Sequence, residues 1–158
     1  MVESGELWNE VGVMTMFMGE FNHSIDVKNR VIVPAKFRDE LGEQFVVSAG
    51  LDGCLYLTKK ADWEEFAKRL AELPMTNEAR QLVRFFMRNA QECEPDKQGR
   101  IVIPQGLKDL AGLEKDIVMI GSVSKVEIWS KEKLDSQSGD ESMEDIVEKL
   151  STEYGLKF

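Results

Sequence analysis

Two stretches of the chain, seventy residues apart, carry nearly the same sequence. The first runs Asp26-Val-Lys-Asn-Arg-Val-Ile-Val-Pro34 and the second runs Asp96-Lys-Gln-Gly-Arg-Ile-Val-Ile-Pro104. Over the aligned ranges 26–42 and 96–112, about five of seventeen positions are identical. The chain is therefore an internal duplication. Because two copies of one small unit tend to pair about a pseudo-twofold axis, the Asp-x-x-x-Arg turns of both copies are expected on one related surface.

Each copy carries signals for the same local structure. A turn with Asp and a residue that tolerates the left-handed conformation, Asn29 or Gly99, leads into a β-branched run, which predicts a hairpin feeding a buried strand. Pro34 and Pro104 then suit the first turn of a short helix. The residues expected to face inward are Phe37, Leu41, Leu107, Leu110 and Ala111. A second hairpin follows, so each unit is predicted to be hairpin, short helix, hairpin.

A different kind of sequence separates the copies. Apolar residues recur at helical spacing on both sides of Pro74, which predicts an αα linker whose apolar stripes pack on the sheet. At 158 residues, one compact duplicated α+β domain is favoured over two independent ones. The predicted segments are an acidic leader at 1–15, repeat one at 20–62, the helical linker at 63–90, repeat two at 91–134, and an acidic tail at 135–158 with a possible helix.

The net charge of −9 is unevenly distributed along the chain. The segments 1–16 and 134–158 together hold ten acids and two bases, which leaves −1 for the residues between them. Locally basic surfaces are therefore possible in the central part, because charges beyond a Debye length of about 8 Å are screened. The candidate phosphate-binding residues are Lys28, Arg30, Lys36, Arg38, Lys97, Arg100 and Lys108.

The remaining polar residues of the sequence form no pattern that predicts a catalytic site, a metal site or a cofactor-binding site. His23 is the single histidine, and the two cysteines, Cys54 and Cys93, lack a Cys-x-x-Cys partner. No phosphate-binding loop or nucleophile elbow occurs. The basic stripe of Arg80, Arg84 and Arg88 is interpreted as a solvated or subunit-contacting face. Since the sequence has neither a long apolar run nor a signal-peptide pattern, we expect a cytoplasmic protein without membrane attachment.

The chemistry of the repeated turn leaves two interpretations open. Asp26 and Asp96 are suited to accept a backbone N–H two residues on, or to pair with the arginine four residues later. Arginine is the side chain best suited to bidentate contact with phosphate or guanine. A single turn of this kind is more often a structural clasp, in which the Asp/Arg pair only closes the loop, than a binding element. The repetition of the turn, together with the family resemblance given below, favours a shared binding role instead.

Three segments of the chain resemble the MraZ family of bacterial transcriptional regulators. These are Met16 to Arg38, with Asp-Val-Lys-Asn-Arg, then Cys93 to Pro104, and then Val126-Glu-Ile-Trp-Ser-Lys131. The resemblance covers about Met16 to Lys133 and implies two tandem SpoVT/AbrB-type domains, each of the swapped-hairpin or double-split β-barrel kind. It further implies a nucleoid-associated, ring-shaped homo-oligomer that binds double-stranded DNA at direct repeats upstream of its own division and cell-wall operon.

The resemblance also assigns roles to residues of the two turns. Residues matching the DNA-contacting arginines and their basic neighbours are Lys28, Arg30, Lys97 and Arg100. Residues matching the turn-shaping positions are Asp26, Asn29, Asp96 and Gly99. The chain departs from the family pattern at Asn29, where glycine is usual, and at Met18, where several members have arginine. Asparagine tolerates the left-handed region, so the turn is expected to survive.

Two functional hypotheses follow from these features. The preferred one is a sequence-specific DNA-binding repressor. The alternative is a ring-forming, non-enzymatic interaction module whose Asp/Arg turns are only structural clasps and whose protein partner is unknown. The two hypotheses differ in the salt dependence of DNA binding, because only phosphate contacts lose affinity steeply as salt rises.

Overall fold

The protein is a mixed α+β molecule, described by a computed structural model for residues 16–137 and 139–157. The acidic leader predicted at 1–15 lies outside the described residues. The strands are β1 (Glu20–Ser24), β2 (Arg30–Ile32), β3 (Phe45–Ala49), β4 (Leu55–Lys59), β5 (Ala90–Cys93), β6 (Arg100–Val102), β7 (Asp116–Ser122) and β8 (Lys125–Ser130). The helices are α2 (Ala35–Leu41), α3 (Lys60–Ala71), α4 (Asn77–Arg88), α5 (Gln105–Leu110), α6 (Lys131–Asp135) and α7 (Met143–Tyr154).

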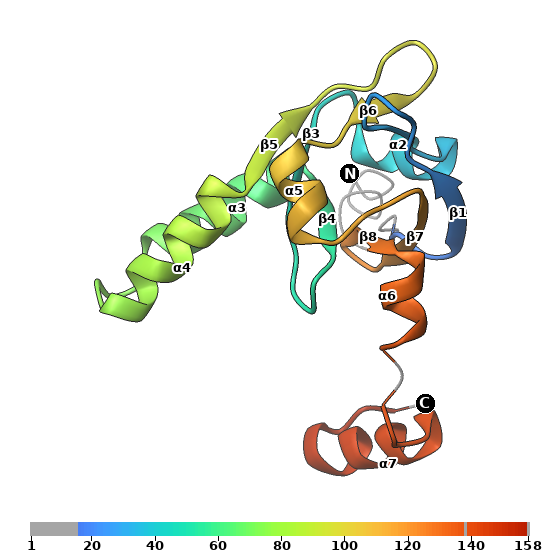
Figure 1. Cartoon of the computed structure of the whole chain (residues 1–158). Coiled ribbons are helices and arrows are strands. Elements are labelled where there is room, and N and C mark those ends of the chain that lie inside the picture. The colour runs from blue at the N-terminus through green and yellow to red at the C-terminus, as the bar shows by residue number, and fades with distance from the viewer. Residues whose placement is uncertain (1–15, 138, 158) are drawn as a thin grey trace, which may run out of the picture.

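Strand pairing follows the duplication. One antiparallel sheet has six strands in the order β1-β7-β8-β4-β3-β5, and a separate ribbon pairs β2 with β6. The strands of the two copies correspond in pairs: β1 to β5, β3 to β7, and β4 to β8. Replacing each strand by its counterpart gives the same order, read from the opposite edge of the sheet. The leading strand of each copy thus pairs with the second hairpin of the other copy. Figure 1 shows the ribbon and the larger sheet in one body.

The predicted first hairpin is the main correction to the sequence analysis. The turns at 26–30 and 96–100 form, but the strands that each turn joins do not pair with each other. Beyond the turn, β1 pairs with β7 and β2 pairs with β6, so the ladder is made between copies. The predicted second hairpins, β3 with β4 and β7 with β8, are confirmed. A local turn pattern predicts the reversal of the chain, whereas it carries no information about which strand completes the ladder.

The core is shared by the two copies. Buried side chains of both β-branched runs and both short helices belong to one cluster, which includes Phe37. The ring of Phe37 meets Phe17 and Phe21 edge-to-face, with centroids 5.9 and 5.0 Å apart. Each copy has too few residues to bury an adequate core alone, so the common cluster explains why the duplicated chain folds as one body.

The short helices α2 and α5 follow the predicted pattern with one exception. Pro34 and Pro104 precede their first turns, and Phe37 and Leu41 are buried. Leu107 in α5 and Ala111, the C-cap residue that follows the helix, face the core with exposed fractions of 4% and 0%. Leu110, predicted to face inward, is 40% exposed. Leu107 and Ala111, at i and i+4 spacing, fill the side that faces the core, and Leu110 lies at its edge.

The two predicted linker helices form a hairpin that projects from the body (Figure 1). Thr76 caps α4, because its hydroxyl oxygen accepts a hydrogen bond from the Ala79 backbone at 3.1 Å. The helices pack on each other through Phe66 and Phe86, whose ring centroids lie 5.1 Å apart. Helix α3 also contacts β3 and β4. The prediction that the stripes pack on the sheet is thus only partly right, since Leu82 remains exposed.

The C-terminal part contains the helix that the sequence allowed. Helix α7 is capped by the Ser142 hydroxyl, which accepts from the Asp145 backbone at 3.1 Å, and it ends at Gly155 in the left-handed region. None of its residues is buried, and Figure 1 places it beyond the end of α6. Among the described residues, no helix has the length and apolar character needed to cross a bilayer.

Substitution of Leu107 by alanine tests the packing of α5. We expect Leu107→Ala to lower the free energy of unfolding by about 2–5 kcal/mol, the usual cost of a cavity in a core. The matched change in the same helix, Leu110→Ala, should cost less than about 1 kcal/mol because that side chain is 40% exposed. Urea denaturation at one fixed protein concentration measures both. Equal losses from the two variants would contradict the orientation of α5.

Candidate functional site

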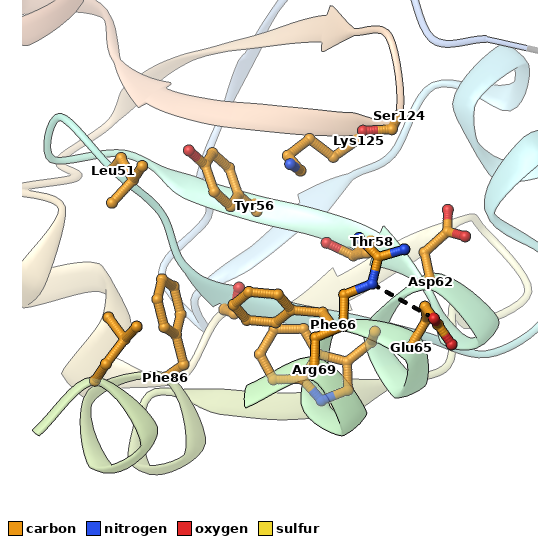
Figure 2. Close-up of a pocket in the computed structure, with 13 residues that line it drawn as sticks. Leu51, Tyr56, Thr58, Asp62, Glu65, Phe66, Arg69, Phe86, Ser124 and Lys125 are labelled. Atoms are coloured by element: carbon orange, nitrogen blue, oxygen red, sulfur yellow. Dashed lines mark ion pairs between the residues drawn. The ribbon is translucent and has the colours of Figure 1, made fainter. Parts of the chain in front are cut away.

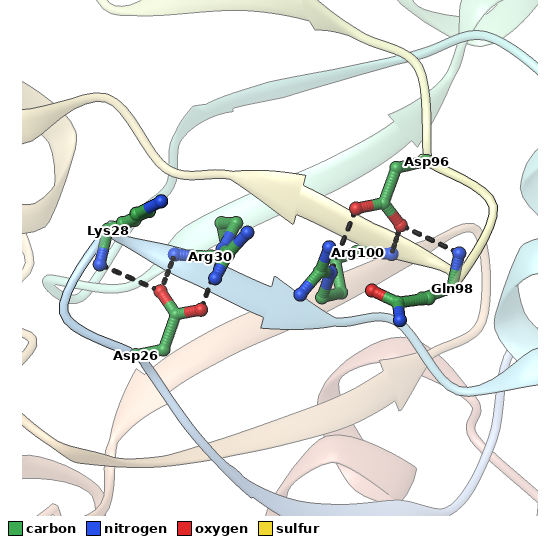
Figure 3. Close-up of polar contacts among 6 residues, drawn as sticks. All are labelled: Asp26, Lys28, Arg30, Asp96, Gln98 and Arg100. Atoms are coloured by element: carbon green, nitrogen blue, oxygen red, sulfur yellow. Dashed lines mark hydrogen bonds and ion pairs between the residues drawn. The ribbon is translucent and has the colours of Figure 1, made fainter.

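The first turn is organised by one carboxylate (Figure 3). Oδ1 of Asp26 accepts hydrogen bonds from the backbone N–H groups of Lys28 and Arg30, at 2.9 and 2.8 Å. Its Oδ2 accepts a bond from Nε of Arg30 at 2.7 Å. The two bonding modes that the sequence left open, backbone acceptance and pairing with the arginine, therefore occur together. Since the arginine is held through Nε, closing the turn does not use the N–H donors of its two terminal Nη groups.

The second turn repeats this geometry. Asp96 Oδ1 accepts from the backbone N–H groups of Gln98 and Arg100, both at 2.9 Å, and Oδ2 accepts from Nε of Arg100 at 2.8 Å. The lysines are not repeated in the same way. Gln98 occupies the place of Lys28, and Lys97 occupies the place of a valine in the first turn. The two arginines are thus equivalent by position, whereas the two lysines are not.

Left-handed backbone at one residue per turn allows both turns to close. Asn29 has a φ of 61° and Gly99 a φ of 79°, so the expected tolerance of asparagine is confirmed. The carbonyl groups of these two residues then reach across the pseudo-twofold axis. The Gly99 carbonyl accepts from the Val33 backbone at 2.9 Å, and the Asn29 carbonyl accepts from the Ile103 backbone at 2.8 Å. Each turn is therefore attached to the strand end of the other copy.

Side chains of the first copy's turn are also held by the second copy's short helix. Lys108 Nζ donates to Oδ1 of Asn29 at 3.0 Å, and Nδ2 of Asn29 donates to Oε1 of Gln105 at 3.1 Å. Lys108 was a candidate phosphate-binding residue, and here its ammonium group supports the turn. Gln105 was missed, because a glutamine at the start of a helix carries no distinctive signal in the sequence.

The reciprocal contact to the second turn is made by Arg38. Its Nε donates to the Val33 carbonyl at 2.8 Å, and its guanidinium lies against Gly99, where an added Cβ would be 2.7 Å from the guanidinium carbon. A glycine is needed at this position for both its φ and its space. Arg38, another predicted phosphate contact, is therefore engaged at the junction between copies, whereas Lys28 and Lys97 are exposed.

The bonding in each turn stabilises the charged carboxylate. In the folded protein the pKa of Asp26 is lowered from 3.8, first by the backbone hydrogen bond from Arg30 and further by its side chain. The pKa of Asp96 is lowered from 3.8 by the matching bonds from Arg100. Both carboxylates therefore stay ionised under mildly acidic conditions and keep the two guanidinium groups oriented.

Together the two turns make a local basic surface on an acidic chain. The range 26–38 holds four bases and one acid, and the range 96–108 holds three bases and one acid. The strands β2 and β6 pair antiparallel, with Val31 opposite Ile101, so Arg30 and Arg100 lie on the same face of the ribbon, diagonally across from each other (Figure 3). A local cluster of positive charge attracts anions even when the net charge of the chain is negative.

A second feature is an apolar recess between the α3–α4 hairpin and the sheet (Figure 2). It has a volume of about 630 Å³. Its lining residues include Leu51, Tyr56, Trp63, Phe66, Leu82 and Phe86. An ion pair between Arg69 and Glu65, 3.5 Å apart, lies at the recess. The stripe of Arg80, Arg84 and Arg88 is exposed on α4.

The cysteines and possible metal ligands add no reactive centre to the described residues. Cys54 and Cys93 are free and buried, and burial raises the pKa of their thiols to about 12 and about 11. Thiols of this kind are poor nucleophiles. Within residues 16–137 and 139–157, no three His, Cys, Asp or Glu side chains are grouped so that they could hold a metal ion.

Comparison with known proteins identifies the family. The family model described as "MraZ protein, putative antitoxin-like" matches residues 16–86 and again residues 85–153. The chain belongs to the MraZ family. A protein named transcriptional regulator MraZ from Lachnoclostridium phytofermentans is 57% identical over 143 residues, covering 90% of this chain and all of that relative. Another of the same name from Clostridium beijerinckii is 59% identical over 119 residues, covering 75% of this chain and 84% of the relative.

The MraZ family match extends into the C-terminal segment, beyond Lys133, where the resemblance seen in the sequence ended. The second matched range ends at residue 153, within α7, whereas the quoted motifs ended at Lys131. A third relative, the transcriptional regulator MraZ of Acetivibrio thermocellus, is 50% identical over 139 residues and covers 86% of this chain. The resemblance predicted from the Asp turns is therefore confirmed, and the relatives are transcriptional regulators by name.

The pKa shifts in the turns predict how stability depends on pH. Because both carboxyl pKa values are lowered, their stabilisation is fully present above the ordinary value of 3.8 and is lost as pH falls through the lower folded values. We expect Asp26→Asn/Asp96→Asn to melt below the wild type at about pH 6, and this difference to shrink towards about pH 3. Thermal melting by circular dichroism measures it, with Asp140→Asn as an exposed control. A difference that is unchanged with pH would contradict the ionic clasp.

Proposed function

We propose that this protein is a sequence-specific DNA-binding repressor that contacts the duplex through its paired Asp/Arg turns. The observation that carries the proposal is the placement of the half-buried Arg30 and Arg100 on the outer face of one antiparallel ribbon, each held through Nε by its own aspartate. A clasp of this kind leaves both Nη groups free to donate to phosphate or guanine. Because the guanidinium is ordered before binding, little side-chain entropy is lost when DNA is bound.

The architecture supports this role. The exchange of leading strands between copies, together with the β2–β6 ribbon, is what a duplicated AbrB-like swapped-hairpin barrel requires. In such an arrangement the two turns of one chain act as a single element with pseudo-twofold symmetry. A two-stranded antiparallel ribbon has dimensions that fit the major groove of B-DNA. Lys28 and Lys97, which are exposed, supply phosphate contacts beside it.

One chain offers few basic residues for a complex that must resist physiological salt. The four candidates on the turns are Lys28, Arg30, Lys97 and Arg100. We infer that chains assemble into a closed ring, which presents several ribbons to direct repeats upstream of the protein's own operon. Direct repeats suit neighbours related head to tail, whereas an isolated twofold dimer favours palindromes. Linking the sites raises the effective concentration of each ribbon for the next repeat.

Removal of the clasped arginines tests the DNA contact. We expect Arg30→Ala and Arg100→Ala each to weaken binding to the upstream region of the operon by about 1–3 kcal/mol per engaged turn, because a bidentate contact is lost. The matched control is Arg69→Ala, which removes an arginine that is also paired with an acid four residues away, Glu65, but lies on α3. Gel shifts at several salt concentrations measure affinity, and gel filtration confirms assembly.

The dependence of DNA affinity on salt concentration, measured in the same gel shifts, separates the two hypotheses for the protein. A repressor that uses these arginines loses affinity steeply as salt rises, and the slope becomes shallower in the variants. An interaction module whose turns are only clasps binds the upstream DNA at no salt concentration. Unchanged affinity in Arg30→Ala and Arg100→Ala, with unchanged assembly, would remove the turns from the binding surface.

Assembly is tested by varying the number of repeats in the DNA. We expect a light-scattering mass of several chains, and affinity that rises with one, two and three direct repeats, by up to about 10² to 10⁴ overall. The gain comes from linkage and not from new contacts. A duplex with the same repeats separated by half a helical turn serves as the control. A monomeric mass, or affinity independent of repeat number, would contradict the ring.

A further inference from the structure

The outer face of the β2–β6 ribbon carries two aliphatic side chains as well as the two arginines. Side chains alternate between the faces of a strand, and Val31 and Ile101 point inward with exposed fractions of 1% and 3%. Ile32 and Val102 point outward and are 45% and 53% exposed. The position is equivalent in the two copies, so the duplicated chain has kept a β-branched aliphatic at both exposed sites.

The register of the ribbon places each arginine beside an aliphatic side chain of the other copy. Arg30 lies opposite Val102, and Ile32 lies opposite Arg100. Opposite side chains in an antiparallel pair have Cβ atoms about 4.5–5.5 Å apart. On the outer face, two guanidinium groups and two aliphatic groups therefore alternate, both along each strand and across the ribbon. Arginine and aliphatic side chains at alternate positions of one strand are about 6.6 Å apart, or about two base steps.

Aliphatic side chains gain nothing from phosphate, but the floor of the major groove offers them a partner. Thymine is the base that presents a methyl group there, and it is read by apolar contact, while arginine reads guanine. We propose that Ile32 and Val102 are specificity-determining residues that contact thymine methyl groups next to the bases or phosphates held by Arg30 and Arg100. This inference rests on the DNA-binding role proposed above and assigns the ribbon's outer face to base readout.

Removal of the thymine methyl groups from the DNA tests the proposal without perturbing the protein. The probe is the upstream duplex, amplified either with thymidine or with deoxyuridine at every thymidine position. Burial of one methyl group contributes about a fourfold change in affinity, so wild-type protein should bind the uracil duplex at least about fourfold more weakly. Equal affinity of wild-type protein for the two duplexes would overturn the proposal.

A double-mutant cycle then assigns the effect to these side chains. Ile32→Ala/Val102→Ala should bind the two duplexes equally, within about twofold, because the groups that sense the methyls are gone. Any change in DNA shape caused by uracil is common to both proteins and cancels in the cycle. If the variant keeps the wild-type discrimination, the methyl groups are read elsewhere and the proposal fails.

Two further variants control for folding and for general loss of exposed aliphatic surface. Ile32→Thr/Val102→Thr keeps a β-branched side chain with one methyl, so it should fold and retain part of the discrimination. Val123→Ala removes an exposed valine that directly follows the last residue of β7. The first turn lies near the other end of β7, where Asp116 pairs with Ser24. This variant should therefore discriminate between the duplexes as wild type does. Loss of discrimination in Val123→Ala would overturn the assignment.

Failure of this inference is distinguishable from failure of the proposed function. If wild-type protein binds neither duplex at low salt, the DNA-binding role itself is wrong. If it binds the thymidine duplex through Arg30 and Arg100, but with no preference over uracil, the repressor role stands and the ribbon reads only the DNA backbone or guanine. The two outcomes are separated by the arginine variants, which lose affinity for both duplexes equally.

Discussion

The backbone bonds between the two turns and the opposite strand ends hold this structure together. The Gly99 carbonyl accepts from the Val33 backbone, and the Asn29 carbonyl accepts from the Ile103 backbone, so each turn is tied to a strand end of the other copy. The strands between these bonds have only three residues each, too few to form a stable ladder alone. Their inward side chains belong to the common core, which couples the position of the turns to the folding of the whole domain.

Rigidity of the turns follows from the number of donors around each aspartate. One carboxylate accepts three hydrogen bonds, two from backbone and one from the arginine, and the same set occurs in both copies. Exposed ion pairs contribute little by themselves, because water screens them. Here the pair also fixes the loop, so its effect is on the direction of the guanidinium groups. Preorganisation of this kind is what a binding surface made of long, mobile side chains needs.

The copies are alike in the turns and different in what supports them. Asn29 is held by Lys108 and Gln105 through its side chain, whereas Gly99 has no side chain and is covered by the guanidinium of Arg38. Equivalent positions thus meet different neighbours, which explains why one position takes asparagine and the other glycine. The pseudo-twofold axis relates the backbone and the arginines, while the lysines differ. A surface of this kind is nearly symmetric in shape and asymmetric in charge.

The sequence by itself determined the duplication, the turns and the short helices, because these depend on local rules. In both copies an aspartate, a left-handed residue and an arginine close a loop through bonds that span only five residues, and the MraZ relationship was recognised from the same residues. The strand pattern did not decide which strands pair, since it is satisfied equally by a partner in its own copy or in the other; the family resemblance implied swapped hairpins, and the tertiary structure decided the partners and their register. It also decided that Arg38 and Lys108 support the turns, that Leu110 is exposed, and that Ile32 and Val102 lie beside the arginines. These outcomes depend on long-range register, which places residues seventy positions apart within hydrogen-bonding distance and leaves no trace in local sequence.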